Sequence, residues 1–316
     1  MQRRDALHIL GLASLSLLAA GGCSAPQSVA SSPVAPATPP ANAISLAQWS
    51  LHRRFGFGRP DERAKDPANP LDFARITRAE FGLSRVEYVN QFYAPRIHEP
   101  TLATELRKRA DDHGVTSLLI MCDGEGICGP ADEKGRAQFA ENHRKWLALA
   151  QALGCHSIRV NAIGEGSKEE QAGRCADGLA RLVAIAKTYG QQVIVENHGG
   201  LSSDGAWLAG VIRSVNDPAL GTLPDFGNWR DGSGVLQDPV RNVGLVMPFA
   251  KGVSAKSYGF DAEGNETTLD YPRIMAEVRA VGYTGAIGIE FEGKTMSEAD
   301  GINATRRLLE RLGCVA

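Results

Sequence analysis

Acidic side chains stand at the ends of three apolar, β-favouring stretches in the second half of this chain. Glu196 ends the stretch VIVE, Asp225 follows GTLP, and Glu290 ends IGIE. Three carboxylates that meet in one place repel one another unless a positive charge lies between them. A divalent cation would supply that charge. An all-oxygen ligand set favours Mg²⁺ or Mn²⁺, and an added imidazole would also admit Co²⁺ or Zn²⁺.

Further polar groups follow the same stretches at a spacing of two. His198 follows Glu196, Glu292 follows Glu290, and Lys256 follows Ser254. Side chains two apart on a strand share a face, so each pair is expected to point the same way. His198 is interpreted as a group that polarises a carbonyl or carries a proton near neutral pH, with a purely structural histidine as the alternative.

Short apolar segments alternate with helical patterns from Ile44 onward. The predicted strands are Ile44–Leu51, Arg85–Phe92, Thr116–Met121, Ser157–Ala162, Gln192–Glu196, Gly221–Asp225, Gly252–Ser257 and Ala286–Phe291. Apolar residues three and four apart predict helices that include Gln138–Leu153, Gly173–Tyr189 and Ile274–Val281. Gly154, Gly190, Gly282 and Gly313 are expected to end helices, and Asp270 to cap one.

Eight strand–helix units over about 270 residues predict one (β/α)₈ TIM barrel, an α/β fold. An open doubly wound sheet is the competing architecture, but no G-x-G-x-x-G or Walker pattern opens an early helix. In a barrel the carboxyl ends of the strands surround one mouth, so the polar strand ends are expected to meet there.

Other side chains on inward-facing strands are candidate substrate contacts. They are Trp49, Glu87, Arg159 and Asn161, together with Asn228 beyond the sixth strand. Trp49 is alternatively a core residue. The segment MCDGEGICG, which contains Asp123 and Glu125, is interpreted as a mobile loop over the mouth or a solvated turn.

The ordered strand ends VENHGG, DFGN and IEFEG resemble the xylose isomerase-like TIM-barrel superfamily, and within it the sugar isomerase/epimerase group, from Ile44 to Gly313. This resemblance implies one divalent metal held by Glu196, Asp225 and Glu290. It also implies that these two glutamates exchange a proton with the substrate carbon, assisted by Lys256 and His198. The seventh strand of the family usually reads His-x-Lys, and here Ser254 replaces the histidine, which predicts a weak ligand and weaker metal binding.

The expected activity is therefore metal-dependent isomerisation or epimerisation of an unphosphorylated carbohydrate, by proton transfer at a carbon next to a carbonyl. A keto-sugar lyase or hydratase that uses the same site is one alternative. A non-catalytic, exported carbohydrate-binding barrel is the other. The superfamily's branch that cleaves abasic DNA is disfavoured, because no strand end carries an H-x-H pair.

The first 43 residues differ in composition from the rest. Residues 1–23 contain Arg3-Arg4, a short Leu/Ala-rich run and a small-residue region ending at Cys23, which is typical of a twin-arginine-like export signal. Cys23 is a candidate lipid-anchor site, with a plain cleaved signal as the alternative. Residues 24–43 form a Ser/Ala/Pro-rich linker before the barrel of residues 44–316. We expect export to the periplasm, either free or anchored to a membrane facing it.

Net charge and cysteine content limit the binding partners and disulfides that we expect. The net charge of −2 predicts no nucleic-acid binding, and barrels of this type often form homodimers, although no interface pattern is visible. Five cysteines follow Cys23 without a C-x-x-C pair. Cys122 and Cys128 are a candidate disulfide in an oxidising compartment, and isolated buried thiols are the alternative.

Overall fold

The computed structural model describes residues 42–316, and the predicted export signal and nearly all of the predicted linker lie outside this range. Eight parallel strands form one sheet in the order β6-β5-β4-β3-β2-β1-β8-β7. Their bounds are β1 Ile44–Ala47, β2 Arg85–Val89, β3 Thr116–Met121, β4 Ser157–Asn161, β5 Gln192–Glu196, β6 Leu220–Leu223, β7 Ser254–Ser257 and β8 Ile287–Phe291. Every predicted strand is present.

The sheet closes between β6 and β7 through isolated contacts rather than a continuous ladder. Parallel bridges join Thr222 to Ala250 and Asp225 to Ser254. Backbone hydrogen bonds run from Ser254 N to the Pro224 carbonyl at 2.9 Å and from Phe226 N to the Ser254 carbonyl at 3.0 Å. The predicted (β/α)₈ barrel is therefore confirmed, and two residues of the predicted site belong to its closing contact.

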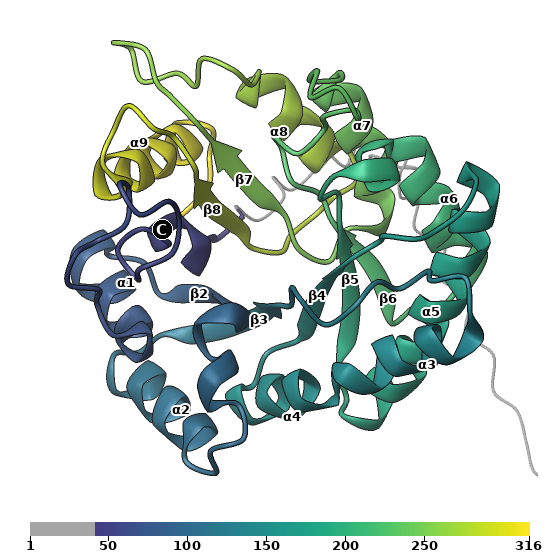
Figure 1. Ribbon diagram of the computed structural model, residues 1–316. Coiled ribbons are helices and arrows are strands. Elements are labelled where there is room, and N and C mark those ends of the chain that lie inside the picture. The colour runs from purple at the N-terminus through teal and green to yellow at the C-terminus, as the bar shows by residue number, and fades with distance from the viewer. Residues whose placement is uncertain (1–41) are drawn as a thin grey trace, which may run out of the picture. The chain divides into compact units, whose positions relative to one another are not determined.

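Helices follow each strand and cover the outside of the barrel, as Figure 1 shows. Their bounds are α1 Phe73–Phe81, α2 Leu102–Asp112, α3 Glu133–Asn142, α4 Arg144–Leu153, α5 Lys168–Thr188, α6 Gly205–Val215, α7 Pro239–Val246, α8 Tyr271–Ala280 and α9 Glu298–Arg311. Asp270 caps α8 by accepting from Arg273 N, as predicted. None of the helices in residues 42–316 is long and apolar enough to cross a membrane.

Most predicted bounds differ from the structure by one to five residues at an end. Three predicted elements differ more substantially, each for a local reason. The first two strands stop early because residues 48–51 and 90–92 form 3₁₀ turns. The buried side chain of Gln48 joins these turns by accepting from Val89 N and donating to the Tyr93 hydroxyl. The predicted helix 138–153 is two helices that meet at His143, whose ring contacts the Phe139 carbonyl at 2.8 Å.

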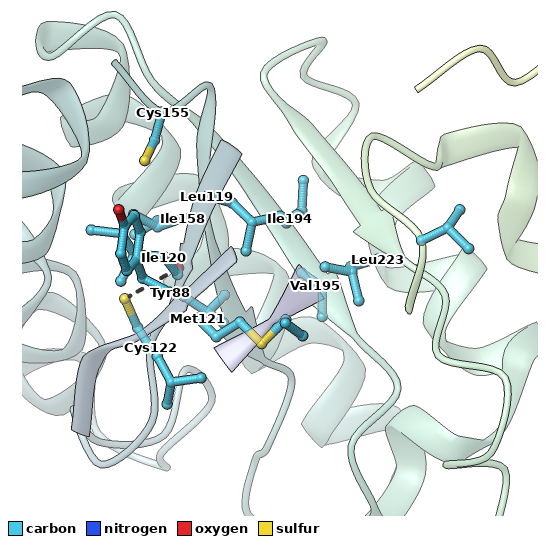
Figure 2. Packing of buried hydrophobic residues seen from close by; sticks show 14 of the residues in the cluster. Tyr88, Leu119, Ile120, Met121, Cys122, Cys155, Ile158, Ile194, Val195 and Leu223 are labelled. Atoms are coloured by element: carbon cyan, nitrogen blue, oxygen red, sulfur yellow. Dashed lines mark hydrogen bonds between the residues drawn. The ribbon is translucent and has the colours of Figure 1, made fainter. Parts of the chain in front are cut away.

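The core lies between the sheet and the helices, and the strands are almost fully buried on both faces. Figure 2 shows part of it, where Leu119 and Ile194 lie on one side of the strands and Ile120 and Ile158 lie with Tyr88 on the other. Near-continuous apolar runs of this kind are expected of parallel strands covered by helices. The core thus fixes the strand ends on which the polar residues stand.

Candidate functional site

The carboxylates of Glu196, Asp225 and Glu290 come together at the carboxyl ends of β5, β6 and β8. One oxygen from each lies within 4.8 Å of the others, and all three side chains are buried. The convergence expected from the sequence is therefore present in the structure.

Asn197 and the turn after β6 fix the position of Asp225. Asn197 donates to the Asp225 carbonyl and accepts from Asp225 N at 2.8 Å, which ties β5 to the end of β6. Asp225 Oδ1 accepts from the backbone N–H groups of Gly227 and Asn228, both at 2.8 Å. The other oxygen, Oδ2, is left to face the site.

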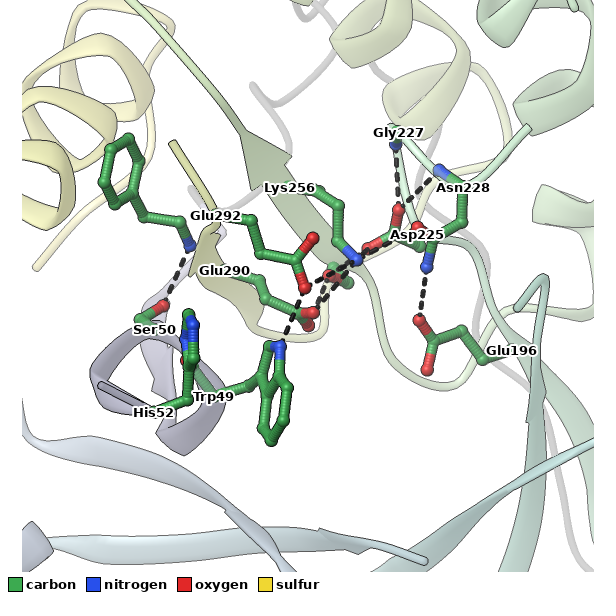
Figure 3. A network of polar contacts seen from close by, with 12 residues as sticks. Trp49, Ser50, His52, Glu196, Asp225, Gly227, Asn228, Lys256, Glu290 and Glu292 are labelled. Atoms are coloured by element: carbon green, nitrogen blue, oxygen red, sulfur yellow. Dashed lines mark hydrogen bonds and ion pairs between the residues drawn. The ribbon is translucent and has the colours of Figure 1, made fainter. Parts of the chain in front are cut away.

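Lys256 lies among these carboxylates (Figure 3). Its Nζ is 3.1 Å from Glu290 Oε1, 3.5 Å from Glu292 Oε1 and 3.7 Å from Asp225 Oδ2. Ser254 is on the same face of β7 and donates to Asp225 Oδ2 at 2.7 Å or Glu290 Oε2 at 3.1 Å. A hydroxyl has one proton, so it satisfies only one of these carboxylates at a time.

The pKa values of the buried acids diverge. Burial and the charge of Glu290 raise the pKa of both Glu196 and Asp225 to about 7, against the opposing effects of Arg159 and Lys256. Burial also disfavours the ionised form of Glu290, but Lys256 and Arg159 outweigh it and lower the pKa of Glu290. Burial disfavours the Lys256 ammonium, yet Asp225 and Glu290 raise its pKa well above the usual range. The described residues thus hold more negative than positive charge at this point.

Arg159 and Asn161 form the β4 side of the site with Asp123. Asp123 Oδ1 accepts from Arg159 at 2.8 Å and from Asn161 at 2.7 Å. Arg159 Nε lies 2.8 Å from Glu196 Oε2, but without hydrogen-bond geometry, so neither atom has a hydrogen-bond partner among residues 42–316. Glu196 Oε2 is therefore a buried acceptor that the described residues pair with a charge, Arg159, but not with a hydrogen bond.

A cavity of about 410 Å³ opens beside these groups. Its lining residues are Trp49, Val89, Gln91, Asp123, Arg159, His198, Glu290 and Glu292. A cavity of this size falls within the range of small-molecule sites. His198 lies exposed at its mouth, and its pKa is lowered by desolvation among the surrounding groups and by Arg159 and Lys256. At neutral pH this imidazole is mainly uncharged and can donate or accept.

Trp49 and Asn228 lie on opposite sides of Lys256 (Figure 3). Trp49 Nε1 donates to Glu292 Oε1 at 2.8 Å, while the ring lines the cavity. Asn228 donates to Glu196 Oε1 and accepts from Lys256 Nζ, both at 3.0 Å. Both residues, predicted as substrate contacts, are next to the acids.

Glu87 lies deeper in the barrel and does not line the cavity. Its Oε1 accepts from Ser45 at 2.6 Å, and its carboxylate occupies the space where a side chain at Gly288 would be. Burial raises the pKa of Glu87 to about 7, with Ser45 opposing and Glu290 adding to the shift. Gly288 is two residues before Glu290, so Glu87 supports the site from below.

Four lining residues were outside the predicted set of site residues: Val89, Gln91, Asp123 and Glu292. The sequence did carry a signal for two of them: Glu292 is two residues after Glu290, and Asp123 lies in a glycine-rich loop. Gln91 carried no signal, because it belongs to a 3₁₀ turn that was predicted as strand. Glu125, in the glycine-rich loop with Asp123, points away from the cavity and accepts from Trp146 at 2.6 Å and from Lys145 at 2.9 Å.

The donor set fits a divalent cation. It offers three carboxylates, one oxygen without a hydrogen-bond partner in the described chain, and raised pKa values that a bound cation would lower. Ser254 adds one neutral oxygen at the position where the family that the sequence resembles usually has a histidine.

Comparison with known proteins agrees with this architecture. The sequence matches the xylose isomerase-like TIM barrel family over residues 78–312. No match is found among curated protein sequences.

Solved structures share the fold at low sequence identity. The 3-keto-D-glucoside 4-epimerase of E. coli is 17% identical with a TM-score of 0.63, covering 79% of this chain and 97% of that one. A D-tagatose 3-epimerase-like protein is 17% identical with a TM-score of 0.63, and the match covers 85% of this chain and 97% of that one. A xylose isomerase-like TIM barrel protein from Mycobacterium smegmatis, solved in complex with magnesium, is 17% identical with a TM-score of 0.62. The match covers 86% of this chain and 97% of that one.

Proposed function

The chain belongs to the xylose isomerase-like TIM barrel family, and from this premise we propose that it is a metal-dependent sugar isomerase or epimerase. Its substrate would be an unphosphorylated carbohydrate, in which it moves a proton at a carbon next to a carbonyl. The observation that carries the proposal is the meeting of Glu196, Asp225 and Glu290, with oxygens within 4.8 Å of one another, beside a cavity of about 410 Å³.

Glu196, Asp225 and Glu290 would hold the ion, and Ser254 would complete the set weakly. A bound divalent cation would polarise the substrate carbonyl and offset the negative charge that develops on its oxygen. The all-oxygen donor set favours Mg²⁺ or Mn²⁺.

Proton transfer would be the task of the two glutamates. One of Glu196 and Glu290 removes the proton and the other returns it. A positioned acid–base group of this kind contributes on the order of 10² to 10⁴ in rate. Lys256 is protonated and fixed by Glu290 and Asn228, so it is suited to stabilise an oxyanion rather than to act as a nucleophile. His198, uncharged at the mouth, would donate a hydrogen bond to a substrate oxygen.

Binding of the sugar would use the remaining walls of the cavity. The Trp49 ring offers an apolar face, and Asp123, Arg159 and Glu292 offer hydrogen-bonding groups around it. The same constellation could carry out elimination or hydration of a keto-sugar, which is the second enzymatic proposal.

A non-catalytic carbohydrate-binding barrel remains the alternative of a different class. The observation that favours it is Lys256, whose ammonium already contacts the carboxylates at 3.1 to 3.7 Å, together with Ser254 in place of a stronger ligand. Such a protein would bind sugar without a metal and without proton transfer.

The test is exchange of substrate hydrogen with solvent, which detects proton removal before the product is known. The purified chain is treated with chelator, supplied with Mg²⁺, Mn²⁺, Co²⁺ or Zn²⁺, and incubated in D₂O with a panel of keto-sugars read by NMR. We expect deuterium next to the carbonyl only when a metal is present.

Glu290→Gln should reduce this exchange by about 10² or more while the circular dichroism spectrum stays unchanged. Glu263→Gln, on an exposed loop, is the matched control and should exchange normally. Exchange by Glu290→Gln at the normal rate would show that the proton-transfer assignment is wrong. Sugar binding without exchange under any metal would favour the non-catalytic barrel.

A further inference from the structure

Two of the buried thiols lie against each other at a distance from the site. All five cysteines in residues 42–316 are free and buried. Cys128 lies in the loop after β3 and Cys175 is in α5, and the neighbouring Cys175 thiol together with burial raises the pKa of Cys128 well above its usual range. Cys122, which the sequence suggested as the partner of Cys128, instead donates to the Ile120 carbonyl (Figure 2).

Glycines allow this close approach. A Cβ at Gly129 would lie 2.7 Å from Cys175 Sγ and 2.9 Å from Cys175 N. A Cβ at Gly178, one helical turn after Cys175, would lie 1.9 Å from the Cys128 carbonyl oxygen. The backbone at residues 128 and 129 therefore packs directly against α5 beside Cys175. A disulfide requires this kind of backbone proximity, because its two Cα atoms are usually about 4.4 to 6.8 Å apart.

The surrounding contacts hold both thiols in place. Cys128 Sγ also donates to the Ile163 carbonyl at 3.4 Å, and Gly129 and Gly164 form a parallel bridge beside it. Gly164 would place a Cβ 3.1 Å from Cys175 Sγ. The pair thus lies in a layer formed by the loops after β3 and β4 and by α5.

We propose that Cys128 and Cys175 form a disulfide when the chain folds or equilibrates with a disulfide donor, and that this bond fastens the loop after β3 to α5. The loop includes Asp123, which contacts Arg159 and Asn161 in the site. The inference does not depend on the proposed function.

The chemistry is thiol–disulfide exchange with a donor such as oxidised glutathione. One cysteine thiolate attacks the donor, its S–S bond breaks, and a mixed disulfide forms as one glutathione thiolate leaves. The second cysteine thiolate attacks the protein sulfur of that mixed disulfide and releases the other glutathione thiolate. Two protein sulfurs are oxidised, one glutathione disulfide is reduced to two thiols, and these take up the two cysteine protons.

Refolding tests this directly, because every thiol is accessible in the unfolded chain. The reduced full chain is unfolded, refolded in a glutathione redox buffer, alkylated, and mapped by mass spectrometry of its peptides. We expect one dominant linked peptide, Cys128 to Cys175, and a Tm higher by roughly a few degrees than that of the reduced chain.

Matched variants separate this pairing from general oxidation. Cys175→Ser should lose the linked peptide, whereas Cys122→Ser and Cys155→Ser should keep it. A soluble, refolded chain with all thiols alkylated, or with Cys128 linked to another cysteine, would overturn the proposal. If Cys175→Ser does not fold, the peptide map of the unaltered chain decides alone.

Discussion

Replacing Lys256 by methionine should have opposite effects on stability and on metal affinity. Lys256 is 2% exposed and contacts Glu290, Glu292 and Asp225. Methionine keeps much of the apolar stem but removes the charge. Removing one partner of a buried ionic group costs about 3 to 5 kcal/mol, because the remaining charges are uncompensated. For a chain of this size, that is a fall in Tm of roughly 6 to 20 °C in chelator.

The same variant should bind Mn²⁺ at least about tenfold more tightly, because a cation no longer has to share the carboxylates with an ammonium. Differential scanning fluorimetry in chelator and titration calorimetry with Mn²⁺ measure the two effects. Lys294→Met, on the surface, is the control and should change neither. If Lys256→Met melts close to the unaltered chain in chelator and gains no affinity, the balance of charge described for this site is wrong.

Two further predictions concern the same acids. Ser254→His should raise the affinity for Mn²⁺ or Zn²⁺ by about tenfold or more, because it adds an imidazole ligand, whereas Ser254→Ala should not. Calorimetry measures both affinities. Equal affinities of the two variants would remove position 254 from the ligand set. In chelator, the free energy of unfolding should fall as pH rises from about 5 to 7.5. The pKa values of Glu87, Glu196 and Asp225 are raised to about 7, so the folded chain binds more protons there than the unfolded one. Urea titrations across this range measure it, and a rise would contradict the assignment.

The strands could be predicted because strands that are buried on both faces consist of consecutive apolar residues. A parallel strand covered on both faces is a short apolar run, so Thr116–Met121 and Gln192–Glu196 were predicted to the residue. The convergence of three acids followed from barrel topology, since the carboxyl ends of all the strands surround the same mouth.

Contacts between distant residues could not be predicted in this way. Gln48 ends the first strand by bonding to Val89 and Tyr93, and Gln91 reaches the cavity from the turn that results. The proximity of Cys128 and Cys175 depends on two glycines that admit the loop to α5. No periodicity in the sequence records such pairings.

How the barrel closes has a consequence for how the protein would respond to a ligand. Around most of the ring, neighbouring strands share ladders, but β6 and β7 are joined by single bridges, one of which pairs Asp225 with Ser254. The least extensively paired joint of the sheet therefore coincides with the acidic centre. A ligand that bridges those carboxylates would also join the strands at this joint, so ligand occupancy and the stability of the barrel are expected to be thermodynamically coupled.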